Sequence, residues 1–235
     1  MNILITGVHG FVGSNLVKAL VPEHTIFGLD IVAPKKEGVK KTFFWEDLPS
    51  TNLGQTQLLD FPKIDAIIHL AGKAHDTRNK STADVYFRVN TGLTQRIFDW
   101  FLTSKSAKKF IFFSTVKSAA DRVEGEFLTE ECVPTPVGPY GESKIKAEDY
   151  IIGHFAPEAL ERPYHNFNDS DSIIKDKQVY IMRPCMIHGP GNKGNLNLLY
   201  GVVSEGIPWP LGAFENRRSF TSIGNLCVVI DGFLT

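Results

Sequence analysis

Short, nearly continuous apolar runs recur along the first three quarters of this chain, and each is followed by a longer and more polar stretch. Runs of this kind, without regular polar alternation, are typical of parallel strands buried on both faces of a sheet. We therefore expect six strands, at residues 2–6, 25–29, 42–45, 66–70, 109–113 and 179–182.

The stretches between these runs carry a different pattern. Apolar residues recur at helical spacing over residues 11–20, 85–104 and 141–152. Alternation of strand and helix is typical of right-handed βαβ units, in which all strands run parallel. The pattern predicts an α/β fold, with the doubly wound parallel sheet of the Rossmann architecture.

Two regions interrupt the alternation. Residues 154–177 are polar and rich in aspartate, which predicts a surface excursion. After residue 182 the sequence becomes rich in glycine, proline and asparagine. We expect a nucleotide-binding domain over residues 1–182, and a partial C-terminal substrate lobe over residues 183–235.

Composition removes several classes of function. The 235 residues carry a net charge of −1 without a basic patch, which argues against nucleic-acid or anionic membrane partners. No apolar run approaches the ~20 residues of a membrane helix, and the start lacks the basic region of a signal peptide. The three cysteines are widely spaced and show no metal-ligand spacing. We expect a cytoplasmic protein without a metal site.

The first apolar run ends in a glycine-rich turn, Gly7-x-x-Gly10-x-x-Gly13. Gly7 permits a tight turn, Gly10 lets the backbone approach a pyrophosphate, and Gly13 allows the following helix to pack closely on the strand. The free amides and the dipole of the helix N-terminus favour phosphate. This pattern predicts a dinucleotide site.

The second apolar run is followed at once by Asp30, where a carboxylate can accept both hydroxyl groups of a ribose. A carboxylate at this place repels a 2′-phosphate, so NAD is favoured over NADP as the cofactor. Lys35 and Lys36 lie close enough in the chain to keep NADP open.

Tyr140 and Lys144 lie one helical turn apart. A free tyrosine has a pKa near ~10, which is high for an acid/base group at neutral pH. The Lys144 ammonium and a positively charged nicotinamide ring would both favour the phenolate. Tyr140 is therefore a candidate proton donor and acceptor beside a hydride-transferring cofactor.

Further motifs occur in the order in which one enzyme family has them. They are Asp47-Leu48, His69-Leu70-Ala71-Gly72, Asn90-Thr91-Gly92, Ser114-Thr115 and Arg183-Pro184. Together with the glycine turn, Asp30 and the Tyr140/Lys144 pair, they make residues 1 to about 230 resemble the extended short-chain dehydrogenase/reductase family. Within it they resemble the NAD-dependent epimerase/dehydratase group, which acts on nucleotide sugars.

This resemblance implies a set of site residues. The implied NAD-binding residues are Gly7, Gly10, Phe11, Val12, Gly13, Asp30, Asp47, Leu48, Leu70, Ala71, Gly72, Asn90, Tyr140 and Lys144. Asp47 and Leu48 stand where the family contacts adenine, while Asn90 has the alternative role of a helix-start cap. Thr115 is implied as a catalytic hydroxyl beside Tyr140 and Lys144, with the adjacent Ser114 as the alternative and as a substrate contact.

Three segments bear on the reaction. Val116-Lys117 stand where the family's 4,6-dehydratases carry an acid and a base after the catalytic threonine, which disfavours dehydration. The segments around Asn195 and Arg217-Arg218 resemble bacterial reductases of UDP-4-keto-6-deoxy-N-acetylhexosamines, enzymes of surface polysaccharide synthesis. Arginine forks suit a diphosphate, although one of the two adjacent arginines can be purely structural.

Three functions follow as hypotheses. The first is an NAD-dependent reductase that transfers hydride to C4 of a UDP-4-keto sugar. The second is a UDP-hexose 4-epimerase, which uses the same catalytic residues; the absence of the asparagine that such enzymes have near Met186 weighs against it. The third is an inactive NAD-binding fragment, because family members usually extend several tens of residues beyond Thr235.

The resemblance also implies a homodimer, with the helix of Tyr140 and the helix around Asn90 packing against their symmetry mates. Large apolar residues on several sides of residues 85–104 agree with such an interface. They include Val89, Leu93, Ile97, Trp100 and Phe101. The alternative is that residues 154–177 fold back over this surface in a monomer.

Overall fold

The computed structural model describes residues 1–49, 61–74, 82–123, 125–162, 167, 171–192, 195–206 and 218–235. At positions 195 and 198 it describes the backbone alone.

Six parallel strands form the central sheet. They are β1 (Asn2–Thr6), β2 (Thr25–Asp30), β3 (Val39–Phe44), β4 (Ala66–His69), β5 (Lys109–Phe113) and β6 (Gln178–Met182). They are hydrogen-bonded in the order β3-β2-β1-β4-β5-β6, and each neighbouring pair is parallel. This order confirms the predicted doubly wound α/β fold.

The strand β3 begins before the predicted start at residue 42, because the apolar pattern misses its first half. Lys40 and Lys41 lie there with exposed side chains. β3 is an edge strand, and an edge strand keeps part of its surface in water, so it need not be continuously apolar.

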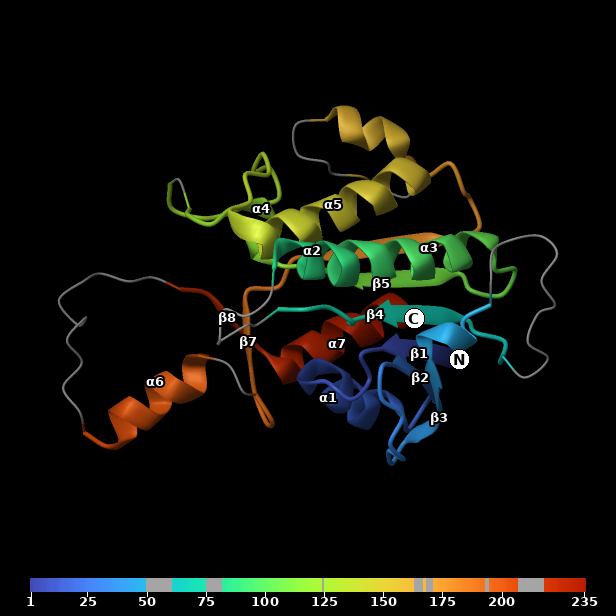
Figure 1. Cartoon of the computed structure of the whole chain (residues 1–235), viewed down its shortest axis with the longest axis horizontal. Coiled ribbons are helices and arrows are strands. Elements are labelled where there is room, and N and C mark those ends of the chain that lie inside the picture. The colour runs from blue at the N-terminus through green and yellow to red at the C-terminus, as the bar shows by residue number, and fades with distance from the viewer. Residues whose placement is uncertain are drawn as a thin grey trace.

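Helices cover both faces of the sheet (Figure 1). One layer contains α1 (Phe11–Leu20) and α7 (Ile223–Leu234). The other contains α2 (Ala83–Tyr86), a π-helical turn η2 (Phe87–Gly92), α3 (Leu93–Thr103) and α5 (Gly138–Phe155). Short elements complete this part: the 3-10 turns η1 (Trp45–Asp47) and η3 (Pro157–Glu161), and the helix α4 (Val116–Ala119).

Each helical layer packs against its own face of the sheet. On the α3 and α5 side, the buried side chains include Leu4, Ile67, Phe98, Phe110, Phe112 and Phe155. On the α1 and α7 side, they include Ile3, Ile5, Leu16, Ile68, Ile111 and Ile230. Successive residues of one strand point to opposite faces, so a strand with two covered faces must be apolar throughout. Among the helices of the described ranges, none has both the length and the apolar character needed to cross a membrane.

The predicted helix at residues 85–104 is divided by the π-helical turn η2. At this place the Thr94 hydroxyl donates to the Asn90 carbonyl oxygen at 2.6 Å. The Asn90 side chain is fully buried and is bonded outside its own helix. The bonds of the Asn90 side chain are tertiary contacts, which apolar periodicity cannot report.

The strands β1 and β4 lie side by side at the centre, and the chain leaves them toward opposite edges of the sheet. Their carboxyl ends are in register, with Thr6 beside His69. In open α/β sheets, ligands bind at this crossover point. The fold therefore locates the candidate site at the ends of β1, β4 and their neighbours.

The C-terminal region adds a two-stranded parallel sheet, β7 (Met186–His188) with β8 (Phe220–Ser222), and the helix α6 (Asn195–Ser204). The helix α7, which we expected in a separate lobe, packs on the main sheet beside α1 (Figure 1). The Lys109 ammonium donates to the carbonyl oxygens of Phe233 and Leu234 at 3.0 and 2.7 Å. The domain boundary at residue 183 stays a prediction, but α7 is part of the first helical layer.

Candidate active site

The glycine turn connects β1 to α1 with the geometry expected of a phosphate-binding turn. Gly7 has a φ of +67°, which favours glycine. A Cβ on Gly13 would lie 2.6 Å from the Gly7 carbonyl oxygen, so the helix can start this close to the strand only with glycine there. Gly10 precedes the first residue of α1 and has no side chain to cap the helix. The free amides at this end of α1 are suited to a pyrophosphate.

Asp30 lies beside this turn at the end of β2. Its carboxylate accepts the backbone N–H of His9 at 3.2 Å and that of Ile31 at 2.8 Å. The turn and the carboxylate are thereby held together, as the predicted ribose contact requires.

Asp47 and Leu48 have other contacts in this chain. Asp47 accepts the backbone N–H of Phe44 at 2.8 Å and so closes the turn η1. The Leu48 side chain is buried in the core on the α3 side. For Leu48, an adenine contact would have to come from the backbone, because its side chain packs inward.

The end of β4 is fixed by Thr6. The Thr6 hydroxyl oxygen accepts the backbone N–H groups of Leu70 and Ala71 at 3.1 and 2.9 Å. It also lies 2.7 Å from Nδ1 of His69. Since the oxygen already accepts two bonds, its own hydrogen points to Nδ1, and the His69 proton is on Nε2.

His69 continues this chain of bonds through Nε2, which lies 2.9 Å from the Thr94 hydroxyl. Burial, with a smaller effect of the nearby Lys144 charge, holds the pKa of His69 well below its usual value. His69 is therefore a neutral residue that links β1 to α3.

Asn90 connects the β4 end to the helix α5. Its Oδ1 accepts the Lys73 N–H at 2.7 Å, and its Nδ2 donates to the Lys73 carbonyl oxygen at 3.1 Å and to the Ser143 hydroxyl at 2.9 Å. The alternative of a helix-start cap does not match these contacts. A Cβ on Gly72 would lie 3.0 Å from Asn90 Oδ1 and 3.2 Å from Lys144 Nζ, so Gly72 brings the backbone close to both.

Tyr140 lies in the first turn of α5, close to Thr115. Burial raises the pKa of Tyr140, and a hydrogen bond with the Thr115 hydroxyl partly opposes the rise. We expected Lys144 to lower this pKa, but it is not among the groups that shift it in the chain alone. The expected effect of a positive nicotinamide ring belongs to the complex with NAD.

Lys144 is buried one turn further along α5, with a side chain that is 5% exposed. Its ammonium donates to the Phe113 carbonyl oxygen at 2.7 Å and lies 4.8 Å from the centre of the Phe112 ring. Burial lowers its pKa to about 8, and the charge of Glu148 opposes this shift. The ammonium is thus positioned at the end of β5 beside Gly72.

Thr115 and Ser114, which the sequence left as alternatives, face different partners. Thr115 caps α4, accepting the Lys117 N–H at 3.3 Å, and its hydroxyl lies close enough to Tyr140 to lower the pKa of that phenol. The Ser114 hydroxyl donates to the buried carboxylate of Glu148. Of the two hydroxyl groups, that of Thr115 acts on Tyr140, while that of Ser114 is bonded into the interior; the substrate contact of Ser114 stays a prediction.

Two residues near the site were not singled out from the sequence. Glu148 lies on the same face of α5 as Tyr140 and Lys144, at the next helical repeat, and that spacing could have indicated it. Gly141 packs so closely that a Cβ there would lie 2.4 Å from the Lys117 carbonyl oxygen. This close approach brings α4, and with it Thr115, against α5.

The predicted substrate contacts are only partly described. Arg218 is exposed, just before β8. Arg217 and the side chain of Asn195 lie outside the described residues.

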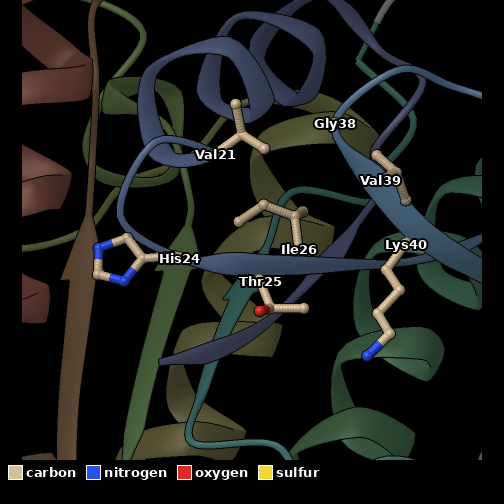
Figure 2. A pocket seen from close by; sticks show the side chains of 7 residues that line it. All are labelled: Val21, His24, Thr25, Ile26, Gly38, Val39 and Lys40. Atoms are coloured by element: carbon tan, nitrogen blue, oxygen red, sulfur yellow. The ribbon is translucent and has the colours of Figure 1, made fainter.

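A separate hollow lies at the amino ends of β2 and β3, at the end of the strands opposite to the candidate site (Figure 2). It is lined by Val21, His24, Thr25, Ile26, Gly38, Val39 and Lys40. These are the amino ends of the strands, so the hollow is not part of the candidate site.

Comparison with known proteins gives one family. The model of the NAD dependent epimerase/dehydratase family matches residues 3–208. UDP-glucose 4-epimerase of Vibrio cholerae is 31% identical over 241 residues, covering 97% of this chain and 65% of that protein. N-acetyl-alpha-D-glucosaminyl-diphospho-ditrans,octacis-undecaprenol 4-epimerase of Escherichia coli O157:H7 is 25% identical, covering 96% and 60%. The chain thus spans less than two thirds of the length of these relatives.

Solved structures agree on the fold. The structure of MoeE5 in complex with UDP-glucuronic acid and NAD has a TM-score of 0.72 at 20% identity, over 100% of this chain and 72% of that one. UDP-glucuronic acid 4-epimerase from Bacillus cereus, in complex with UDP-glucuronic acid and NAD, has a TM-score of 0.68 at 23% identity, over 100% and 73%.

Proposed function

Because this chain belongs to the NAD dependent epimerase/dehydratase family, we propose that it is an NAD-dependent enzyme that moves a hydride at C4 of a UDP-activated hexose. The observation that carries the proposal is the meeting of Thr115, Tyr140 and Lys144 beside Gly72. These groups come from the end of β5 and from α5, and they lie at the carboxyl edge of the sheet where such folds bind their ligands.

The residues present fit a dinucleotide. The glycine turn and the N-terminus of α1 would hold the pyrophosphate, and Asp30 would accept the ribose hydroxyl groups. A carboxylate in this position favours NAD over NADP. Bound NAD supplies the nicotinamide ring that accepts a hydride from the sugar carbon and can return it.

In the proposed reaction Tyr140 handles the proton. Because burial raises the pKa of Tyr140, the phenol is protonated at neutral pH and can donate to a keto oxygen at C4. In the opposite direction, Tyr140 takes the proton from the sugar hydroxyl, and the positive nicotinamide ring of bound NAD would favour the phenolate. Thr115 orients the phenol and the reacting oxygen through its hydroxyl.

Two reactions use this chemistry. A reductase leaves the hydride on C4 of a UDP-4-keto-6-deoxy-N-acetylhexose; its support is the sequence around Asn195 and Arg217. A 4-epimerase returns the hydride to the other face of the sugar, and its support is that both curated relatives above are named 4-epimerases. We propose hydride transfer at C4 as the step common to both reactions. The product that forms distinguishes the reductase from the 4-epimerase.

The test is to incubate purified protein with each type of substrate. A reductase oxidises one NADH for each UDP-4-keto sugar consumed, whereas an epimerase interconverts UDP-hexoses without net loss of NADH. Tyr140→Phe should abolish either reaction while NADH still binds. Failure of both reactions, in a protein that binds NADH, would contradict the proposal.

A catalytically inactive NAD-binding protein is the second candidate function. Such a protein would use the glycine turn and Asp30 to hold the cofactor and would not turn over a sugar. Calorimetry with NADH followed by UDP separates the cases, because cofactor binding without UDP binding would favour the inactive protein.

A homodimer remains a proposal. Of the apolar residues expected at the interface, Ile97, Trp100 and Phe101 are buried within the single chain. Leu93, which packs against the core, and Ile145 are only partly buried, and their remaining exposed surface could contribute to an interface. Light scattering at micromolar concentration should give twice the chain mass, and a monomer that binds NADH would rule the dimer out.

A further inference from the structure

Glu148 is a fully buried carboxylate in the middle of α5, with no exposed surface. Arg183 donates to its Oε2 from Nε at 2.9 Å and from Nη2 at 2.5 Å. The Ser118 hydroxyl lies 2.6 Å from its Oε1, and the Ser114 hydroxyl donates to the same oxygen. A buried charge with this many partners is stable only while all of them stay in place.

These partners belong to the segments that position the catalytic groups. Ser114 directly precedes Thr115, and Ser118 lies in α4, the helix that Thr115 caps. Arg183 directly follows β6, and the next residue, Pro184, accepts the N–H of Val116 at 3.3 Å. The Glu148 carboxylate therefore ties α5, which carries Tyr140, to the segment that carries Thr115.

Lys144 also binds the segment that carries Thr115. Its ammonium donates to Phe113, the residue before Ser114. The charged or titratable groups near Lys144 are Glu148 and His69, together with Tyr140 one turn earlier on α5. His69 is held neutral by its burial, so Glu148 is the negative charge that acts on the ammonium.

We propose that Glu148 is a positioning residue of this site, which holds Thr115 against Tyr140 and places its negative charge one helical turn from the Lys144 ammonium. It touches no reacting atom and acts through the residues it binds. The proposal rests on the proposed function for its activity readout, but its geometry is independent of the substrate.

The variant that tests the proposal is Glu148→Gln, which keeps the shape and removes the charge. We expect kcat to fall on the order of tenfold to a hundredfold, because small displacements of catalytic groups are costly. We expect the Kd of NADH to change little. The alkaline limb of the kcat profile should move to lower pH, since Lys144 loses the charge that favours its ammonium.

Glu142→Gln is the matched control, because Glu142 lies on the same helix with an exposed side chain and accepts only the Gly138 N–H at its start. It should leave kcat and the pH profile unchanged. If Glu148→Gln keeps the native kcat and the native alkaline limb, the positioning role is wrong. If Glu148→Gln does not fold, Ser118→Ala removes one hydrogen-bond partner of Glu148 and keeps the charge of the carboxylate. This variant should lower kcat several-fold and leave the alkaline limb in place. An unaltered kcat would count against the positioning role.

A second measurement needs no turnover. Lys144→Met should raise the unfolding temperature more in the Glu148→Gln background than in the native one, because the ammonium is less favourable without the carboxylate. Equal gains in both backgrounds would overturn the electrostatic part of the role. A native protein that turns over neither substrate would count against the proposed function alone.

Discussion

Replacing Lys144 with methionine should remove activity and, at neutral pH, leave the folded chain without cofactor as stable as before or more stable. The Lys144 side chain is 5% exposed, and burial lowers its pKa from 10.5 to about 8. That interval corresponds to about 3 kcal/mol, at about 1.4 kcal/mol for each pH unit. It is the free energy that the folded chain loses by holding an ammonium, relative to the unfolded chain.

Methionine avoids this loss but also removes a hydrogen bond. The Phe113 carbonyl oxygen, now 2.7 Å from Nζ, would be left without that donor, at a cost of about 1–3 kcal/mol. The net change at pH 7 is therefore a stabilisation between zero and about 2 kcal/mol. The sign follows because burial is the largest cause of the pKa shift.

The pH dependence is the sharper part of this prediction. Between about 8 and 10.5 the unfolded native chain binds more protons than the folded one, so the stability of the native chain rises with pH in this window. The methionine variant lacks that rise. Its advantage should shrink by about 2–3 kcal/mol between pH 7 and pH 10.

Urea unfolding at several pH values, followed by the fluorescence of the buried Trp45 and Trp100, measures this difference. Lys146→Met is the matched control, since Lys146 is exposed on the same helix, and its effect should not change across the window. A stability difference for Lys144→Met that stays constant from pH 7 to pH 10 would show that burial does not lower the pKa of Lys144.

Three further changes test other parts of the structure. Gly141→Ala should lower kcat at least about tenfold and destabilise the fold by about 1–3 kcal/mol, because its Cβ would clash with the Lys117 carbonyl oxygen and push α4 away from α5. Activity assays and urea unfolding measure the two effects, and a fully active, stable variant would contradict the close contact. Lys177→Met should lower the free energy of unfolding in urea by about 2–3 kcal/mol, because the Lys177 ammonium donates to three carbonyl oxygens at 2.6 to 2.8 Å at the end of α3. Unchanged stability would show that these bonds contribute nothing. Asp30→Ala should weaken NADH binding in calorimetry at least about tenfold and NADPH binding much less; equal losses for both would argue against the ribose contact.

Much of the fold follows from local patterns. The strands at residues 2–6 and 109–113 and the helix at 11–20 have the predicted bounds, because buried parallel strands need continuous apolar runs and the helix needs one apolar stripe. The glycine turn and the Tyr140/Lys144 pair are also local, since each depends on spacing within a single turn or helix.

The prediction failed where a residue's environment comes from distant segments. The first half of β3 was missed because its position at the sheet edge, and not its composition, makes it a strand. The helix at residues 85–104 contains a π turn at Asn90, whose side chain is bonded to Lys73 and Ser143, far away in the chain.

Local sequence is enough to specify which chemical groups the site can contain, because turns and helix faces bring residues together over a few positions. Which group faces which depends on the packing of distant segments. It turned Thr115 toward Tyr140 and Ser114 toward Glu148, although the two are neighbours in the chain. It also buried Glu148 against Arg183, and the burial of an ion pair depends on helices and strands that meet only when the whole sheet has formed.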